Sequence, residues 1–421
     1  MLFRTNIIFL YADSLRRDLS ACFIIQEELR SRGFRVFICS RRNFNYFLRV
    51  IMPSKLFVIG QIDMIYSKRI IDEAKAGALS VYFMPAEGFA YDCEYIGMYP
   101  VKYDYSFLEK VFFWGKNSLS WFKNNRSIDD PSKLNQTGYS RLPIAKAYAD
   151  LIQRHEKKIG FIGRFPALND IYSRSVMSFY VGNPKDDRSK TMARLDAESK
   201  AINSYLNLFE RIIYETDFII SLRPHPNEDL NTYKPFIKKY GTRFEINNAF
   251  DVAEWMTECK TIVGLASSSF IDACIVKVPV ICLDVLLGSR ESTSQFDPAL
   301  EWMYESCYLP ESEEEVITLL SKDLAPIATP RFQGLLLDDF TGDTAVVLDN
   351  VINSLTEVKT RMRLFDFVLI KLMIFFDFIL ASRHYLKKNN SLQFDFSYYY
   401  HPISSNLKII TKKILNPLRS S

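Results

Sequence analysis

A histidine between two prolines is the first feature of the sequence that could do chemistry. Arg223 and His225 belong to an Arg-Pro-His-Pro segment that directly follows the apolar run Asp217–Leu222, which has the length of a buried strand. Prolines on both sides restrict the backbone and hold the imidazole in one position. A histidine can donate a hydrogen bond to a phosphate oxygen, and its charge is tunable near neutral pH. The segment therefore suits a catalytic or phosphate-binding role, with a structural turn as the alternative.

A run of serines later in the chain has a similar setting. Ser267, Ser268 and Ser269 link an apolar strand pattern to the helical pattern Ser268–Val276. The first turn of a helix presents unpaired N–H groups and partial positive charge, which suit a phosphate, and serine hydroxyls add further donors. Asp272, one turn later, could accept hydrogen bonds from ribose hydroxyls. Because serine is also a good N-cap, simple capping is the alternative.

A carboxylate in the first third of the chain has the setting of a general base. Glu87 belongs to a Pro-Ala-Glu-Gly segment just beyond another apolar strand pattern, and the glycine lets a substrate approach closely. A surface glutamate in a turn is the alternative. Three weaker candidates complete the set: Gly163 ends a strand pattern and could line a phosphate region, and Asp13 and Arg17 flank an early strand-to-helix turn where an acceptor could bind.

Fingerprints of several other sites are absent from the sequence. It contains no glycine-rich dinucleotide motif, no phosphate-loop motif and no His-Glu-x-x-His zinc motif. None of the seven cysteines forms a Cys-x-x-Cys pair, which favours reduced thiols in a cytosolic protein over disulfides or a zinc site. We therefore expect no metal ion and no cofactor besides a nucleotide co-substrate.

Most of these candidates follow apolar strand patterns, which occur in two series along the chain. The first series comprises Asn6–Leu10, Arg35–Cys39, Leu56–Gly60, Ser80–Met84 and Lys110–Trp114. The second series comprises Lys158–Ile162, Asp217–Leu222, Thr261–Gly264 and Pro279–Leu283. Strands separated by helix-length segments imply βαβ units and a parallel sheet.

Two such series predict an α/β fold of the GT-B type, with two Rossmann-like domains facing each other across a cleft. We expect an acceptor-binding domain in residues 1–150 and a nucleotide-sugar-binding domain in residues 151–340. Ligands of open α/β sheets bind beyond the carboxyl ends of the strands, where the candidate residues lie. The polar segment Pro166–Arg194 is predicted to be a loop over the cleft, followed by a helix over Ala197–Thr216.

The last part of the chain, residues 341–421, has a different character and is predicted to be a helical, membrane-associating tail. Leu364–Leu380 is a 17-residue apolar segment with three charged residues, Asp366, Lys371 and Asp377. A spanning helix needs about 20 predominantly apolar residues, and central charges are costly. Because basic residues flank the segment, an amphipathic helix on the membrane surface is favoured. A helix packed on the body or at a dimer contact is the alternative.

The net charge of +4 is unevenly distributed. From Lys359 to the C-terminus there are eleven Lys and Arg against three Asp, which gives +8 and leaves about −4 for the remainder. A basic, apolar tail fits an anionic membrane surface and gives no reason to expect a nucleic-acid partner. The N-terminus shows no signal peptide. These features predict a cytoplasmic protein that is peripheral on the inner face of the cytoplasmic membrane.

The motifs in this order resemble those of bacterial sialyltransferases and polysialyltransferases, which carry D/E-D/E-G, HP and SS/ST elements. They also resemble surface carbohydrate biosynthesis proteins and, more distantly, CDP-glycerol glycerophosphotransferases and capsule Kdo transferases. The resemblance spans about residues 5–330. It implies that Glu87 is the general base and that His225, Ser267 and Ser268 contact the cytidylate phosphate. Ala86 stands where the motif has its first acidic residue.

The resemblance implies an inverting, metal-independent glycosyltransferase. It would use a CMP-activated sugar, sialic-acid-like or Kdo-like, and a glycan or glycolipid acceptor to build a surface polysaccharide such as capsule or lipopolysaccharide. One alternative is a CDP-glycerol or CDP-ribitol phosphotransferase of cell-surface polymer synthesis. Others are a UDP-sugar-using GT-B enzyme, including an epimerase, and a catalytically silent assembly subunit at the membrane.

Overall fold

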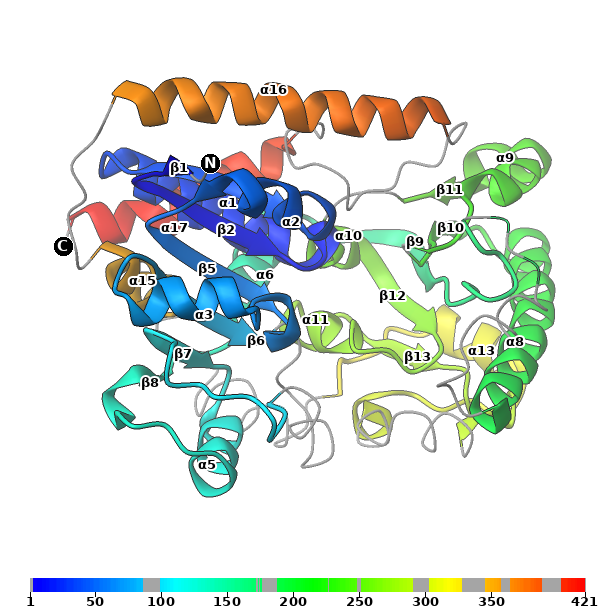
Figure 1. The fold of residues 1–421 in the computed structure, drawn as a ribbon. Helices are drawn as coiled ribbons and strands as arrows, with labels where there is room; N and C mark the ends of the chain where they lie inside the picture. The colour runs from blue at the N-terminus through cyan, green and yellow to red at the C-terminus, as the bar shows by residue number, and fades with distance from the viewer. Residues whose placement is uncertain are drawn as a thin grey trace. The chain divides into compact units, whose positions relative to one another are not determined.

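The chain folds around two separate parallel β-sheets (Figure 1). The computed structural model describes residues 3–85, 99–171, 173, 175, 188–225, 227–247, 251–290, 303–327, 345–356, 364–387 and 403–420. The contacts divide the chain into two compact units. Unit 1 comprises residues 1–147, 330–388 and 393–421, and unit 2 comprises residues 148–329 and 389–392.

Unit 1 contains a six-stranded sheet in the order β3-β2-β5-β6-β7-β8, and all of its paired strands run parallel. The strands are β2 (Ile7–Ala12), β3 (Arg35–Ser40), β5 (Lys55–Gly60), β6 (Ser80–Pro85), β7 (Lys110–Phe113) and β8 (Leu134–Gln136). A separate two-stranded ladder joins β1 (Phe3–Arg4) to β4 (Ile51–Met52). Because β3 and β5 lie on opposite sides of β2, the order of the strands reverses there. That reversal is where open α/β sheets bind ligands.

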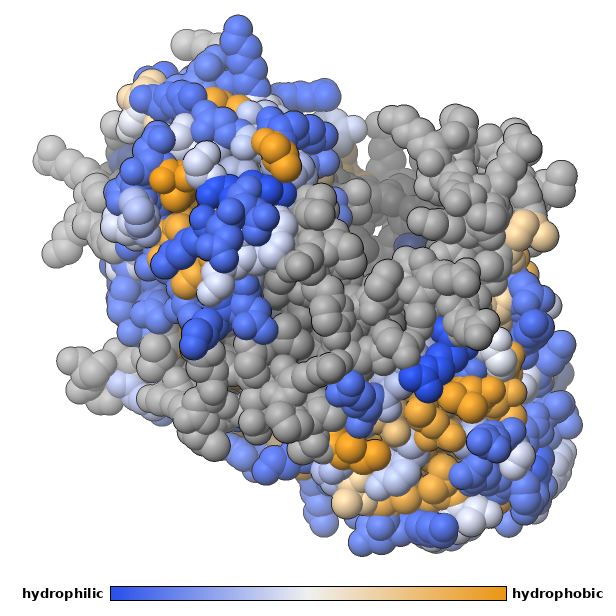
Figure 2. Space-filling model, turned by 90° about the horizontal axis from the view of Figure 1, so that it is seen from below, coloured by the Kyte–Doolittle hydropathy of each residue, from blue (hydrophilic) through white to orange (hydrophobic). Residues whose placement is uncertain are grey.

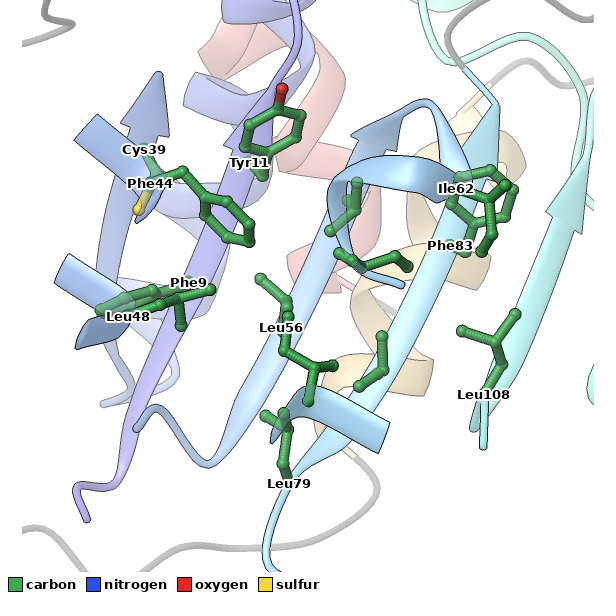
Figure 3. Packing of buried hydrophobic residues seen from close by; sticks show 14 of the residues in the cluster. Phe9, Tyr11, Cys39, Phe44, Leu48, Leu56, Ile62, Leu79, Phe83 and Leu108 are labelled. Atoms are coloured by element: carbon green, nitrogen blue, oxygen red, sulfur yellow. The ribbon is translucent and has the colours of Figure 1, made fainter. Parts of the chain in front are cut away.

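The core of unit 1 is formed by the alternate residues of its strands and by the helices that cover them. Phe9 and Tyr11 of β2 lie beside Phe44 and Leu48 of α2 (Figure 3). The rings of Tyr11 and Phe44 are 4.8 Å apart between centroids. The helices in the first part of the unit are α1 (Leu15–Ser31), α2 (Arg41–Val50), α3 (Lys68–Lys75) and α5 (Lys116–Asn125), with short turns at Ile62–Met64 and Pro131–Lys133. Helix α6 (Leu142–Leu151) begins in unit 1 and ends in unit 2.

Three C-terminal helices belong to unit 1 rather than to a separate body: α15 (Ala345–Thr356), α16 (Leu364–Lys387) and α17 (Ser405–Ser420). Helices α15 and α17 pack against α1 and against each other, and α16 packs on β3. Buried Lys55 donates a 2.5 Å hydrogen bond from Nζ to the carbonyl of Leu355, which ties the end of α15 to β5. Within the described part of the chain, every helix is too short or too polar to cross a bilayer.

Unit 2 contains a five-stranded parallel sheet in the order β11-β10-β9-β12-β13. Its strands are β9 (His155–Ile162), β10 (Ile219–Arg223), β11 (Phe244–Ile246), β12 (Cys259–Gly264) and β13 (Val280–Cys282). Its helices are α8 (Arg188–Glu215), α9 (Lys234–Tyr240), α10 (Val252–Glu258), α11 (Phe270–Ile275) and α13 (Glu313–Ser321), with short turns at Leu230–Tyr233 and Gly241–Arg243. One aromatic and aliphatic core lies between this sheet and α8.

The predicted fold class is confirmed in its main feature, because the chain is an α/β protein with two Rossmann-like parallel sheets, one in each unit. The expected loop over 166–194 is wrong in its last part, since α8 already begins at Arg188. The sequence of its first two turns, Arg188–Arg194, shows no apolar periodicity from which a helix could be predicted. The three-residue strands β8 and β11 were not predicted, because so short a run carries little pattern.

Candidate functional site

The parallel strands of unit 2 end at one edge of the sheet, and the predicted nucleotide-site residues of this unit gather there. Asn247 follows β11, His225 follows β10 and Gly163 follows β9. Ser267 follows β12, and Asp284 follows β13. We call these five segments the carboxyl edge of unit 2. Open α/β sheets bind their ligands at this edge.

The imidazole of His225 has a defined orientation at this edge. Its Nδ1 accepts a 3.2 Å hydrogen bond from the backbone N–H of Asn227. In the neutral ring the proton therefore lies on Nε2, which becomes the hydrogen-bond donor of the side chain. The residue is half-buried, so its backbone is fixed while the ring remains partly accessible. Pro224 precedes it as expected, and the second proline, Pro226, lies outside the described residues.

Glu228 holds the histidine segment in place. Its Oε1 accepts hydrogen bonds from the backbone N–H of His225 at 2.8 Å and of Phe165 at 3.0 Å, and its Oε2 accepts one from the hydroxyl of Tyr233. The side chain is 1 % exposed, and burial raises the pKa of Glu228 above its ordinary range although these hydrogen bonds oppose the shift. Glu228 therefore joins the loops after β9 and β10. The sequence analysis missed it, because a single glutamate in a polar loop gives no pattern.

Gly163 lies where the ends of β9 and β10 approach each other closely. Its N–H donates a 2.8 Å hydrogen bond to the carbonyl of Arg223. A Cβ atom at this position would lie 2.9 Å from Cα of Pro224 and 3.0 Å from Oε1 of Glu228. The geometry therefore gives a steric reason for glycine at this position, besides the phosphate contact expected from the sequence.

Arg223 is the last residue of β10, and its side chain is mostly buried. Nη1 donates a 2.9 Å hydrogen bond to Oδ1 of Asn247, and the guanidinium carbon lies 5.7 Å from the ring centroid of Trp255. Trp255 in turn donates a 2.9 Å hydrogen bond to Oγ of Ser221. The positive charge of Arg223 is thus held at the carboxyl edge by a ring and an amide.

The serine segment begins its helix later than the sequence predicted. Helix α11 starts at Phe270, and it has six residues. The hydroxyl of Ser267 accepts a 3.3 Å hydrogen bond from the backbone N–H of Ser269 and lies 2.8 Å from its Oγ, which forms a local turn before the helix. Ser268 is exposed at the tip of this turn, whereas Asp272 is buried on the inner side of α11.

A second buried carboxylate, which the sequence analysis also missed, supports the serine segment. Asp284 is fully buried, and its Oδ2 accepts hydrogen bonds from the backbone N–H of Ala266 at 3.0 Å and from the hydroxyl of Tyr304 at 2.8 Å. Its Oδ1 accepts a 2.8 Å hydrogen bond from Ser289. The carbonyl of Ala266 accepts a further hydrogen bond from Nη1 of Arg164. Both the N–H and the carbonyl of Ala266, the residue before the three serines, are therefore hydrogen-bonded.

The acceptor-side candidates lie at the carboxyl edge of the unit 1 sheet. Asp13 follows β2, and its Oδ1 accepts a 3.1 Å hydrogen bond from the hydroxyl of Tyr11. Arg17 lies 3.5 Å from Oδ2 of Asp13 and 3.0 Å from Oδ1 of buried Asp18. The two residues thus belong to one ion-pair cluster after β2.

Glu87 lies outside the described residues. The described stretch before it ends at Pro85, the last residue of β6. The carbonyl of Pro85 accepts a 3.1 Å hydrogen bond from Nε1 of Trp114. The role of Glu87 as a base therefore stays a prediction. Among the described residues, no group of three or more His, Cys, Asp or Glu side chains is arranged to hold a metal ion.

Comparison with known proteins yields only structural similarity. No protein-family model matches the chain, and no curated protein matches it. Solved structures that it resembles include UDP-GlcNAc 2-epimerase of Methanocaldococcus jannaschii in complex with UDP-GlcNAc and UDP (12 % identity, 84 % of this chain and 99 % of that chain, TM-score 0.44). Another is the wall teichoic acid polymerase TagF in a form soaked with CDPG (13 %, 84 % and 88 %, TM-score 0.49). These similarities concern the fold and assign no substrate.

Proposed function

We propose that the chain is a nucleotide-dependent transferase and that the phosphate of a cytidine donor binds at the carboxyl edge of unit 2. The observation that carries this proposal is the convergence of five strand ends, two of which are fixed by buried carboxylates. Glu228 fixes the segment of His225, and Asp284 fixes the segment of Ser267. Donors that are oriented before the ligand arrives stabilise developing charge without reorganisation, commonly by about 3–4 kcal/mol each.

In the first form of the proposal the donor is a CMP-activated sugar. Glu87 takes the proton from an acceptor hydroxyl, and the oxygen attacks the anomeric carbon from the side opposite the phosphate. The bond from that carbon to the phosphate oxygen breaks, and CMP leaves with the electron pair. Nε2–H of His225 and the hydroxyls of Ser267 and Ser268 donate to the leaving phosphate. The configuration of the sugar is inverted.

A second form, the transfer of glycerol phosphate or ribitol phosphate from a CDP-activated donor, is favoured by the charge of this edge. Here the acceptor oxygen attacks the outer phosphorus, and CMP again leaves. Arg164, Arg223 and Arg290 all lie in segments at the carboxyl edge, and Arg290 lies 4.8 Å over the ring of Tyr304, which binds Asp284. Three arginines suit the greater negative charge of a diphosphate.

The donor can be identified by incubating the full chain with CMP-sialic acid, CMP-Kdo, CDP-glycerol, CDP-ribitol and UDP-GlcNAc. Thermal shift reports binding, because a ligand that favours the folded state raises the melting temperature. Chromatography reports the nucleotide that is released. CMP released from a CMP-sugar supports the first form, and CMP released from a CDP-polyol supports the second. Exclusive binding of the uridine donor contradicts both and supports the UDP-sugar alternative.

The role of His225 can be tested with a matched control within the same sheet. We expect His225→Ala to lower turnover by about 100-fold or more, the usual effect of removing one preorganised donor. His155 is exposed at the opposite, amino end of β9, and its Nδ1 also accepts a hydrogen bond from the backbone N–H two residues on. His155→Ala should therefore leave turnover unchanged. Equal activity of both folded variants would exclude the proposed site.

The base is tested separately from the phosphate site. Glu87→Gln should leave the thermal shift by donor or CMP intact and abolish transfer to the acceptor, because the amide cannot take a proton at neutral pH. A folded Glu87→Gln protein with full turnover would remove this residue from the mechanism while leaving the nucleotide site in place.

A further inference from the structure

Helix α16 buries two aspartates against the body of unit 1 and exposes most of its large apolar residues to solvent. Among the residues of the helix whose burial is described, the buried ones are Asp366, Ile370, Met373 and Asp377, and their spacing of four, three and four follows one side of a helix. Both aspartates are at most 2 % exposed. Nine large apolar side chains of the same helix are each at least 42 % exposed: Leu364, Phe365, Phe367, Val368, Leu372, Phe375, Phe376, Phe378 and Ile379. We call these nine the outer face of α16.

Specific contacts fix this orientation. Asn43 of α2 donates a hydrogen bond from Nδ2 to Oδ1 of Asp377, and Ile370 and Met373 belong to the same buried cluster as Phe44. Any rotation of α16 that buried its aromatic face would break these contacts and expose both carboxylates. The outer face therefore follows from how the helix is attached to α2 and β3 (Figure 1).

The size of the outer face is unusual for a surface in water. Nine side chains that are about half exposed amount to an apolar surface on the order of 800 Å², and the largest patch of an ordinary monomer is about 300–600 Å². On the face drawn in Figure 2, by contrast, hydrophobic residues form groups interspersed with hydrophilic ones. An exposed apolar surface of this size marks an interaction site.

The charges around the outer face favour a lipid headgroup over a second protein copy. Lys371 is exposed in the middle of the outer face, whereas both acidic residues of Leu364–Leu380 are buried. A second copy on this face would find no carboxylate of α16 for Lys371, and a two-fold contact would bring the two lysines together. A phosphate headgroup supplies the missing anion, while the lysine stem lies along the apolar surface.

Helix α2, which touches α16 through Asn43, adds residues of the same kind. Tyr46 and Val50 are exposed on its outer side, and the guanidinium carbon of Arg49 lies 5.8 Å from the ring centroid of Tyr46. An aromatic ring paired with a cation beside an apolar surface is typical of a protein segment that lies at a bilayer surface.

We propose that α16 lies flat in the interfacial region of an anionic phospholipid bilayer, with its outer face among the acyl chains and Lys371 at the headgroup phosphates. The helix has 24 residues, a length of about 36 Å, and it lies parallel to the membrane plane. This docking specifies which side of the helix meets the lipid, and it does not depend on the nucleotide chemistry of unit 2.

Cosedimentation with vesicles tests the proposal on the full chain. Vesicles of phosphatidylcholine and phosphatidylglycerol in equal parts should bind the wild-type protein, and Phe375→Ser with Phe376→Ser should weaken binding tenfold or more. The matched control exchanges two exposed apolar residues of unit 2, Tyr214→Ser and Ile237→Ser, and should bind as the wild type. Because all four positions are exposed, the variants should melt as the wild type does.

Three results would overturn the proposal. They are wild-type protein that stays in the supernatant, an α16 variant that binds as well as the control, and a wild-type dimer in sedimentation equilibrium that the α16 exchanges convert to monomer. The last result would assign the outer face to a second copy. Lys371→Glu tests the charge: it should weaken binding to the anionic vesicles at low salt, and unchanged binding would refute the headgroup contact.

Discussion

Replacing Gly163 by alanine tests whether the close approach of β9 and β10 positions the nucleotide site. The new Cβ atom would lie 2.9 Å from Cα of Pro224 and 3.3 Å from the carbonyl oxygen of Arg223. Carbon atoms in contact are normally about 3.5–4.0 Å apart, so the overlap with a backbone atom is about 0.6 Å or more. A backbone atom cannot rotate away, so either Pro224 or Gly163 must move.

Two consequences follow from this overlap, and both can be measured. Overpacking of this kind costs about 1–3 kcal/mol of unfolding free energy. The shift also moves the residue after Pro224, His225, by several tenths of an ångström, and a misplacement approaching 1 Å in a catalytic group can cost about 100-fold in rate. We expect Gly163→Ala to weaken binding of the donor nucleotide and to lower turnover, each about tenfold or more.

Denaturant unfolding and nucleotide titration together form the assay, with Gly241→Ala as the control. Gly241 has a positive φ of 59° and nothing within 4 Å of an added Cβ, so its substitution strains the backbone without touching the carboxyl edge. The control should lose about 1–3 kcal/mol of stability and keep its nucleotide affinity. If Gly163→Ala binds nucleotide as tightly as the control, the ends of β9 and β10 do not position the site.

The buried carboxylates give two further predictions. Burial raises the folded-state pKa of Glu228, so the folded protein binds more protons than the unfolded chain, and the unfolding free energy should fall as pH rises from the ordinary range of glutamate through the raised value. Glu228→Gln should remove that part of the slope in urea unfolding at several pH values, and identical slopes would refute the assignment. Asp284→Ala should cost about 2–4 kcal/mol, because Ala266 N–H and the hydroxyl of Tyr304 lose their acceptor. Asp284→Asn keeps an acceptor and should lose less than about 1 kcal/mol of unfolding free energy. If chemical denaturation shows equal losses for the alanine and asparagine variants, this explanation is contradicted.

All strands of the two sheets except the three-residue strands β8 and β11 could be predicted, because each is a short apolar run bounded by turns. The positions of His225 and Ser267 followed from those strands, since each residue comes directly after one. Glu228 could not be found in this way, because its partner Phe165 is 63 residues away in sequence and the contact exists only once β9 pairs with β10. Asp284 similarly depends on the pairing of β12 with β13. Sequence patterns thus indicate the strands and helices. The hydrogen bonds by which buried Glu228 and Asp284 connect neighbouring loops depend on the order of the strands in the sheet.

The tail illustrates a different limit. The apolar segment predicted a helix, but seventeen nearly uniform residues contain no stripe that indicates which side is buried. The one signal is the spacing of Asp366 and Asp377, which are eleven residues apart and therefore three turns apart on the same side. Ordinary amphipathic reasoning places those aspartates in water. The structure buries both, and Asn43 supplies a hydrogen-bond donor from another helix to Asp377.

The carboxyl edge of unit 2 contains two kinds of residue, which should respond differently to substitution. Glu228 and Asp284 are buried and bind the loops, so conservative variants such as Gln and Asn should preserve the site as far as they preserve the hydrogen bonds. His225 is proposed to act on the phosphate itself, so even an isosteric neutral replacement should lower turnover while leaving stability nearly unchanged. When buried carboxylates hold the donors in place before the ligand binds, the site can stabilise a leaving phosphate without first ordering its loops. We therefore expect stability and turnover to fall together when Glu228 or Asp284 is truncated, and turnover to fall alone when His225 is replaced.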